Sequence, residues 1–269
     1  MIHKQFADFS FRDVPCVICI GVFDGMHLGH QAIIDETVKL ARDLSVQSVA
    51  VTFSRNPKMA KESMPSAAAM QSSGQFEEML SDRGIDYHCV IDFSDDMSKL
   101  TGEEFIALLC TSYEVRAMVV GDSFRAGARA SSVGPSEIKV LLSKYTSSAY
   151  LRVIPPVVMD DEVVSSSLIR GCLLTGDLDK VSRLLGRAYS LDLRGASFIE
   201  DDDCGDASQK RLFIDVRTLG LLLPKEGRYK VRATAEGRSV ETEAFVSEDH
   251  LALELPVRMK PDGIIFLGV

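Results

Sequence analysis

The chain has no long uninterrupted apolar segment. None of its apolar runs approaches the roughly 20 residues needed to span a bilayer. Mixed polar residues follow Met1–Gln5, where a signal peptide would carry an apolar core. We therefore expect a cytoplasmic protein without membrane association. Internal repeats and low-complexity tracts are also missing, and a length of 269 residues allows one or two domains with a sizeable core.

The chain is also poor in positive charge. Its 30 Lys and Arg residues against 39 Asp and Glu residues give a formal net charge of −9. Because a nucleic-acid backbone is bound by a basic face, this balance argues against nucleic acid as the main partner. It does not oppose a nucleoside triphosphate, which needs only a local positive site and Mg²⁺.

Histidine is scarce too, and its placement is informative. Two of the five histidines lie in the ten-residue motif Gly21–His30, GVFDGMHLGH. The apolar run 14–20 before the motif predicts a buried strand, and the apolar spacing over 31–44 predicts a helix. The motif is thus placed on a strand-to-helix turn, where α/β proteins bind phosphates through backbone N–H groups and the helix dipole.

The residue types in this motif suit a polyphosphate. Gly21 and Gly25 permit tight turns and close approach of a ligand, and Gly29 lets the first helical turn lie near the phosphates. His27 and His30 share one face of the helix start and could donate hydrogen bonds to the phosphates. Two alternatives stay open. One is a pair of surface histidines, and the other is a zinc site, although no nearby Cys or His pair completes a tetrahedral set.

Six cysteines are present, and Cys16 and Cys19 form a Cys-x-x-Cys pattern. A redox or zinc role would require the two thiols to converge. Residues three apart on a strand point to opposite faces, so we expect reduced cysteines packed in the core instead.

Strand and helix patterns alternate along the first 160 residues. After a strand at 48–53, a loop is expected over 58–75. The remaining elements are strands at 88–91, 117–120 and 150–154 and helices at 76–83, 103–112 and 136–144. This alternation predicts the α/β class, with a parallel sheet covered by helices on its faces.

A second helix start lies at Val164–Arg170, VSSSLIR. Its serines supply N-cap oxygens and hydroxyl donors, and Arg170 carries a fork of donors about one turn on. We expect the helix N-termini at His30 and Ser166 to bind one triphosphate from two sides. The alternative is an ordinary capped surface helix. A short helix over 177–185 follows.

Five segments together resemble the FMN adenylyltransferase module of the bacterial bifunctional riboflavin kinase/FAD synthetase family, within the His-x-Gly-His nucleotidyltransferase superfamily. They are Gly21–His30, 52–57, 84–105, 119–127 and 164–170. The first and last are highly specific, and the resemblance spans residues 14–190. It implies a Rossmann-like nucleotidyltransferase domain over 1–186 and a further domain over 187–269.

The resemblance implies attack of the FMN phosphate on the α-phosphorus of ATP, giving FAD and pyrophosphate. Mg²⁺ would be held mainly through the ATP phosphates, with no protein ligand assigned. The implied catalytic residues are His27, His30, Ser166 and Arg170. The implied nucleotide- and flavin-binding residues are Gly21, Phe23, Asp24, Gly25, Gly29, Asn56, Asp122, Phe124, Arg125, Ser165 and Ser167. For Asp122, a role as an ordinary turn residue stays open.

The chain departs from the family pattern at several of these positions. Asn56 stands where the family has His, and Arg55 stands where it has Pro, which leads to the hypothesis that Arg55 supplies the missing positive charge. Ala126 replaces an aromatic residue, while Ser167 replaces Thr and keeps the hydroxyl. These changes bear on rate and flavin affinity more than on reaction type.

The region 187–269 lacks the Pro-Thr-Ala-Asn motif with which the family's riboflavin kinase barrel binds ATP and magnesium, although Pro224–Val231 resembles that barrel. We expect a degenerate small β-barrel without kinase activity. The acidic stretch Phe198–Asp206 predicts a solvated loop. The expected strands are 212–216, 229–234, 240–246, 251–255 and 264–267.

Three functions remain to be compared. The first is a monofunctional FMN adenylyltransferase, favoured by the Phe23–Gly25 context and the 165–170 segment. The second is another nucleotidyltransferase of the superfamily that uses CTP or a different acceptor. The third is a flavin- or nucleotide-binding protein without turnover, supported by Asn56, Ala126 and the eroded barrel.

Overall fold

The structure is a computed structural model, and it describes residues 1–5, 11–54, 68–92, 96–201, 209–248, 250–256 and 259–267. The chain forms two compact units. The first comprises residues 1–63 and 77–163, and the second comprises 64–76 and 164–269. Helices α5 (Ser166–Thr175) and α6 (Leu178–Leu185) thus belong with the C-terminal strands. The domain boundary at residue 186 stays a prediction.

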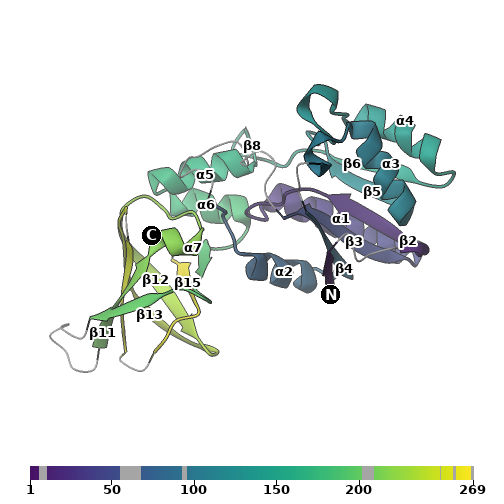
Figure 1. Ribbon diagram of the computed structural model, residues 1–269. Helices are drawn as coiled ribbons and strands as arrows, with labels where there is room; N and C mark the ends of the chain where they lie inside the picture. Colours follow the sequence, from purple (N-terminus) through teal and green to yellow (C-terminus); the bar gives the residue numbers. More distant parts are fainter. Residues whose placement is uncertain are drawn as a thin grey trace. The chain divides into compact units, whose positions relative to one another are not determined.

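A six-stranded parallel sheet forms the centre of the first unit (Figure 1). Its strands lie in the order β1 (Ile2–Gln5), β4 (Tyr87–Ile91), β3 (Gln47–Phe53), β2 (Phe11–Ile20), β5 (Tyr113–Gly121) and β6 (Tyr150–Ile154). All neighbouring pairs are parallel. Strands β3 and β4 follow β2 on one side of it, and the next strand in the chain, β5, pairs with β2 on its other side. The strand order therefore reverses beside β2. Ligands of such sheets bind beyond the carboxyl ends of the strands at this reversal.

Helices cover both faces of this sheet, as predicted. Cys16 packs in one core with α3 (Gly102–Ser112) and α4 (Pro135–Tyr145). On the opposite face, Cys19 forms a hydrogen bond with Thr37 of α1 (Leu28–Leu44). The expectation that the two cysteines point apart is therefore confirmed. Burial raises the pKa of both thiols to about 12, so they remain protonated and serve as core side chains.

The sequence explains where these helices begin. Helix α3 starts with a capping box, in which Thr101 accepts from the Glu104 amide and Glu104 accepts from the Thr101 amide. Helix α4 starts with Pro135, whose missing N–H costs nothing in the first turn. The unit's smaller elements are α2 (Ser73–Asp82, shared with the second unit), η3 (Met97–Lys99), η4 (Arg129–Ser131), β7 (Val158–Met159) and β8 (Glu162–Val163).

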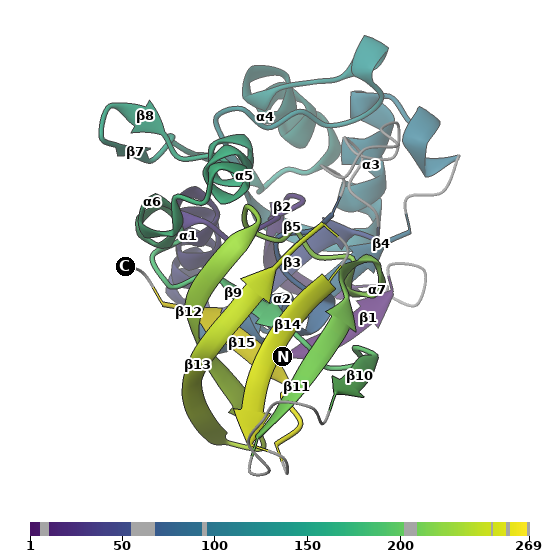
Figure 2. The ribbon, with the colours of Figure 1, turned by 90° about the vertical axis from the view of Figure 1, so that its left-hand side faces the viewer.

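The second unit contains a seven-stranded antiparallel sheet that curls on itself (Figure 2). Its described strands leave β10 and β9 as edges, so the predicted barrel is a curled, open sheet. Apolar side chains alternate into its core, among them Val231, Ala233 and Phe266. The strand order is β10 (Phe198–Asp201), β11 (Gln209–Asp215), β14 (His250–Pro256), β13 (Arg238–Val246), β12 (Gly227–Ala235), β15 (Gly263–Phe266) and β9 (Ser190–Asp192), and α7 spans Val216–Leu219.

Two local predictions need correction. Residues 198–201 of the acidic stretch form strand β10 rather than a loop, because they pair with β11 and Glu200 forms an ion pair of 2.8 Å with Lys210. Residues 202–206 of that stretch lie outside the described residues. The last part of the predicted 58–75 loop is also different, since α2 begins at Ser73. The residues of that loop up to 67 are again outside the described ranges.

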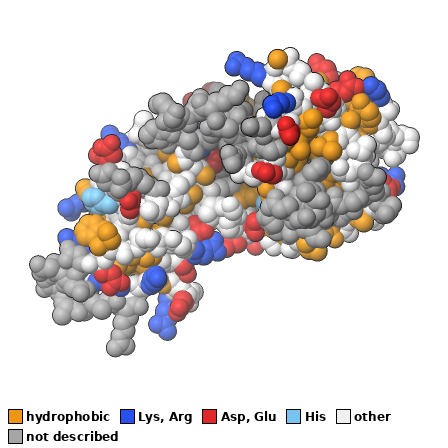
Figure 3. All heavy atoms as spheres, viewed as in Figure 1, with side chains coloured by type: hydrophobic (Ala, Val, Ile, Leu, Met, Phe, Trp, Pro, Cys, Tyr) orange, Lys and Arg blue, Asp and Glu red, His pale blue; other side chains and the backbone are white. Residues whose placement is uncertain are grey.

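The described surface carries charges of both signs. Figure 3 shows Lys and Arg side chains interspersed with Asp and Glu over the face in view. Exposed pairs such as Lys39–Asp43, at 2.7 Å, contribute little to stability because water screens them. Across the described parts of the chain, no helix combines the length and apolar character required to cross a membrane.

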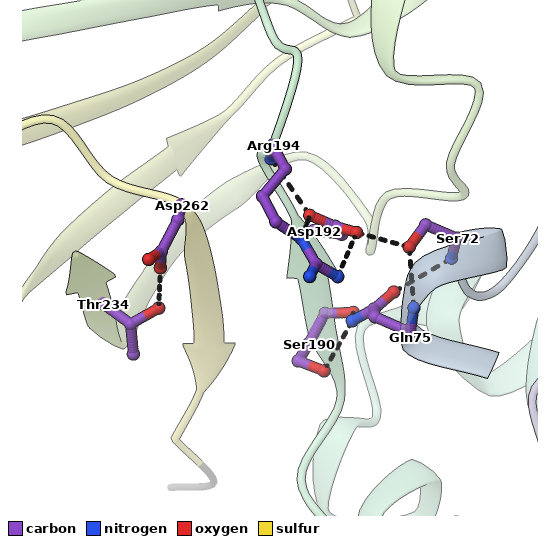
Figure 4. Close-up of polar contacts among 7 residues, drawn as sticks. All are labelled: Ser72, Gln75, Ser190, Asp192, Arg194, Thr234 and Asp262. Atoms are coloured by element: carbon purple, nitrogen blue, oxygen red, sulfur yellow. Dashed lines mark hydrogen bonds and ion pairs between the residues drawn. The ribbon is translucent and has the colours of Figure 1, made fainter. Parts of the chain in front are cut away.

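A polar network within the second unit ties the start of α2 to the curled sheet (Figure 4). Asp192 on β9 accepts two hydrogen bonds of 2.8 Å from the Arg194 guanidinium and one from the Ser72 hydroxyl. Gln75 donates to the Ser190 hydroxyl at 3.0 Å. The backbone adds to this, since the Ala69 amide donates to the Gly220 carbonyl at 3.0 Å. The segment 69–75 is therefore held by residues that follow it by more than a hundred positions.

We expect Asp192→Asn to lower the free energy of unfolding of the second unit by about 1–2 kcal/mol at pH 7. Burial alone would raise the pKa of Asp192, but the hydrogen bonds from Arg194 and Ser72 outweigh it and leave this pKa below its ordinary value of 3.8. A lowered folded-state pKa stabilises the fold above pH 3.8, and this contribution is lost as the pH falls through the folded-state value. Urea unfolding at a series of pH values measures the difference.

The matched control is Glu254→Gln, which removes an exposed ion pair with Arg211 in the same unit. Its effect should be much smaller, because exposed pairs contribute little. Equal losses in the two variants, or an Asp192→Asn loss that persists in strong acid, would contradict the assignment.

Candidate active site

The turn between β2 and α1 is tight and strained. Phe23 and Met26 have positive φ angles of 51° and 41°, and Gly25 has a φ of 81°. The Met26 amide donates to the Phe23 carbonyl at 3.1 Å, which closes the turn. A non-glycine residue in this region costs about 1–3 kcal/mol and persists only where its surroundings fix it. Burial of the Phe23 and Met26 side chains, which are 1% and 0% exposed, offsets part of this cost.

His27 is the N-cap of α1. Its Nδ1 accepts a hydrogen bond from the His30 amide at 3.3 Å, so the proton of the neutral ring is carried by Nε2. The two imidazole rings are stacked, with centroids 3.6 Å apart. Beside them, the first-turn amides of Leu28 and Gly29 have no acceptor within the helix. Two imidazole rings and the first-turn amides therefore lie at the N-terminus of α1, where the helix dipole favours an anion.

Phe23 supports this pair from the core. Its ring meets the His30 ring edge-on, with centroids 5.4 Å apart. Gly21 is needed for this packing, because a Cβ atom there would lie 2.9 to 3.2 Å from carbons of the Phe23 ring. Asp24 is half-buried on the same turn. The roles of Gly21, Phe23, Asp24, Gly25 and Gly29 in nucleotide binding stay predictions.

The segment after β5 leaves the same edge of the sheet as this turn, since β2 and β5 are parallel neighbours. A Cβ atom on Gly121 would lie 3.3 Å from the end of Ile33 on α1, which places the two segments close together. Phe124 donates its amide to the Gly121 carbonyl at 3.0 Å and packs against the core. Asp122 is exposed within this turn. Both readings of Asp122, as a ligand-binding residue and as a turn residue, remain compatible with its position.

Arg125 lies at the N-terminus of α4. Its guanidinium occupies the space beside Gly134, where an added Cβ atom would come within 1.5 Å of Nη1. Backbone hydrogen bonds at Glu137 and Gly134, with a smaller contribution from Arg125, hold the pKa of Glu137 below its ordinary value. Ala126 is 2% exposed and pairs with Val133 through the backbone, which explains why a small side chain fits there. A flavin or nucleotide contact of Arg125 stays a prediction.

The segment matching the family's Thr-Phe-x-Pro-His-Pro pattern is described only at its start. Thr52 lies at the end of β3, and its hydroxyl is 2.8 Å from Nε2 of His88, with both side chains buried. This contact fixes the strand end from which the segment continues. Asn56, a predicted binding residue, is outside the described residues, as is Arg55, which was hypothesised to supply a positive charge.

The second predicted helix start is present in the second unit. Ser165 is the N-cap of α5, and its hydroxyl accepts from the Leu168 amide at 3.3 Å. Ser166 and Ser167 are therefore the first residues of the helix, with amides that lack an acceptor within it. Arg170 lies four residues after Ser166 and so shares its face. The expected capped helix is confirmed, whereas phosphate binding by these residues stays a prediction.

The structure thus brings together the Gly21–His30 motif and the 121–125 segment in the first unit. Within the described ranges, no group of three or more His, Cys, Asp or Glu side chains is placed to hold a metal ion. One contact was not anticipated from the sequence: Gln31 donates its side-chain amide to the Met26 carbonyl at 2.8 Å. A polar residue in the first turn of a helix is the signal that could have suggested it.

The chain is similar to several known proteins. The sequence model of a family described as FAD synthetase matches residues 11–168, more than half of the chain. A bifunctional riboflavin kinase/FMN adenylyltransferase of Listeria monocytogenes is 23% identical over 252 residues, covering 88% of this chain and 74% of that protein. A protein of the same name from Buchnera aphidicola is 26% identical over 66% of this chain, which spans only 56% of that relative.

Two further similarities were found. An FAD synthetase of Listeria monocytogenes is 26% identical over 175 residues, covering 64% of this chain and 69% of that protein. A crystal structure described as a macrolide-efflux protein from Streptococcus pneumoniae has a TM-score of 0.81 and 20% identity, covering 99% of this chain and 89% of that one. At this identity the second similarity establishes a shared fold and nothing about activity.

We expect Gly21→Ala to destabilise the first unit by about 1–3 kcal/mol, since a buried aromatic ring must move to admit the new methyl group. Chemical denaturation followed by circular dichroism measures this loss. Gly121→Ala is the control in the same unit, because its methyl would meet only the flexible end of Ile33 at 3.3 Å. A Gly21→Ala loss no larger than that of the control would contradict the packing described.

Proposed function

The chain belongs to the FAD synthetase family, and we propose that it transfers the adenylyl group of ATP to FMN, giving FAD and pyrophosphate. The observation that carries this proposal is the stacked His27–His30 pair at the N-terminus of α1. This pair follows β2, beside the reversal of strand order, where α/β sheets bind their ligands.

In the proposed reaction, an oxygen of the FMN phosphate attacks the α-phosphorus of ATP. A new P–O bond forms, the bond from the α-phosphorus to the bridging oxygen breaks, and pyrophosphate leaves with the electron pair. No protein nucleophile is needed. Catalysis comes from alignment and from donors aimed at the oxygens where negative charge increases. His27 donates through Nε2–H, since Nδ1 already accepts the His30 amide, and His30 and the first-turn amides of α1 complete the donor set.

The other predicted residues have supporting roles in this proposal. At the start of α5, Ser166, Ser167 and Arg170 bind phosphate oxygens, while Ser165 holds the helix end through its cap. Asp24 and Gly25 border the nucleotide. Asn56 and the segment Asp122–Arg125, including Phe124, lie toward the flavin or the base. Magnesium is taken as part of the MgATP substrate, held mainly through the ATP phosphates.

The proposal also covers the second unit and the cellular setting. We infer that this chain does not phosphorylate riboflavin, because it has no Pro-Thr-Ala-Asn motif. The curled sheet then serves as a support rather than as a second catalytic domain. Neither nucleic acid nor membrane is a proposed partner, and the proposed location is the cytoplasm.

We expect His30→Ala to lower kcat for FAD formation about 100- to 1000-fold, because it removes a donor to the reacting phosphates. Pyrophosphate release from FMN, ATP and Mg²⁺ measures the rate. The matched control is His250→Ala, which changes a histidine of the second unit that contacts Ser247 and Phe213. A His30→Ala enzyme as active as the control, with the same thermal stability, would refute the role of the pair.

The substrates are tested with the unaltered protein. FMN with MgATP should yield FAD and pyrophosphate, and riboflavin with MgATP should yield no FMN. Pyrophosphate release with CTP in place of ATP, or only with another acceptor, would indicate a different nucleotidyltransferase. Binding of FMN and ATP without pyrophosphate release would indicate a binding protein, and formation of FMN from riboflavin would show that kinase activity is retained.

A further inference from the structure

We propose that Gln31 and Arg83 are positioning residues that fix the turn presenting His27 to the substrate. The inference rests on the proposed adenylyl transfer and adds two residues that the motif resemblance does not assign. Neither side chain is proposed to touch the substrate. Both act through the carbonyl of Met26, the residue that immediately precedes His27.

The turn needs such a support because of its backbone. Phe23 and Met26 both adopt left-handed conformations, which are unfavourable for residues other than glycine. Burial fixes the two side chains, but it does not fix the Met26 carbonyl. The orientation of the peptide group between Met26 and His27 determines the position of the His27 backbone, from which the imidazole side chain projects. The side-chain amide of Gln31 donates to this carbonyl at 2.8 Å and so restrains the peptide.

Arg83 determines which way the Gln31 amide faces. Its Nη2 donates to Oε1 of Gln31 at 2.6 Å. Because a guanidinium has only donors, Oε1 must face Arg83 and Nε2 must face Met26. Arg83 is itself held by Asp35, which accepts from Nη1 with both oxygens at 2.6 and 2.7 Å. A continuous chain of contacts thus runs from Asp35 through Arg83 and Gln31 to Met26.

The positions of these residues in the fold explain how the contacts support the turn. Gln31 and Asp35 lie four residues apart on one face of α1, while Arg83 follows the end of α2. The Arg83 side chain is 28% exposed and the Asp35 side chain is 56% exposed, so water reaches this pair mainly from the Asp35 side. Through Arg83, the segment after α2 therefore contacts Gln31 and Asp35 in the first turns of α1 and stabilises the strained turn that precedes them.

The decisive variant is Gln31→Glu. The carboxylate still accepts from Arg83, now with charge assistance, but it has no N–H to donate to the Met26 carbonyl. We expect kcat for FAD formation to fall about 10- to 100-fold, because a misplacement of about 1 Å can cost this much. The KM for ATP should change less than about threefold, and the melting temperature should stay within a few degrees of the wild-type value. A purely structural role of Gln31 predicts a change in stability and none in kcat.

A double-mutant cycle tests whether Arg83 acts through Gln31. Arg83→Ala should lower kcat less than Gln31→Ala, and the double variant should be no slower than Gln31→Ala alone. Arg83→Lys should recover part of the Arg83→Ala loss, since an ammonium can still donate to Gln31. Lys39→Ala, which breaks an exposed pair with Asp43 on the same helix, is the control and should leave kcat unchanged. Additive losses in the cycle would overturn the inference.

A second readout separates this inference from the proposed function. The imidazole NMR signals of His27 and His30 should shift in Gln31→Glu and not in Lys39→Ala. If the wild-type protein forms no FAD but these signals shift, the proposed function fails and the positioning contact stands. If the wild-type protein forms FAD while Gln31→Glu changes neither the signals nor kcat, the positioning role is refuted and the proposed function stands.

Discussion

The parallel pairing of β2 with β3 on one side and β5 on the other is the constraint on which the first unit depends. It directs the chain that leaves β2 and the chain that leaves β5 to the same edge of the sheet. The alternation of side chains along β2 places Cys16 and Cys19 in opposite cores, under α3 and α1. With the strands fixed in this way, a short turn suffices to carry His27 and His30 to the edge.

The chemistry proposed for this edge uses hydrogen-bond donors rather than nucleophiles. The N-cap contact of His27 fixes one ring nitrogen as an acceptor and leaves the other to carry the proton. The stacking of His30 on His27, and its edge contact with Phe23, restrict the rotation of both rings. An arrangement of fixed donors at a helix start suits the proposed adenylyl transfer, which needs no covalent intermediate, because such donors need no reorganisation as charge increases.

The sequence predicts most of the fold, because periodicity and turn residues carry local information. The central strands and helices of the first unit, and the turn bearing His27, were found in this way. Strand β10 was missed because its acidic composition resembles a loop, and only pairing with β11 and Lys210 accounts for it. The contact of Arg83 with Gln31 joins residues 52 positions apart, and no local pattern indicates it. Predictions at Asn56 concern a residue outside the described ranges.

The anchoring of residues 69–75 by β9 and its neighbours has a consequence for biosynthesis. Ser72 and Gln75 leave the ribosome 120 and 115 residues ahead of Asp192 and Ser190, to which they bind. At bacterial-like elongation rates, this delay is of the order of ten seconds. Residues 69–75 must therefore stay accessible in the nascent polypeptide while the later strands are still being synthesised. A polypeptide terminated before β9 would lack Ser190 and Asp192, which bind this segment.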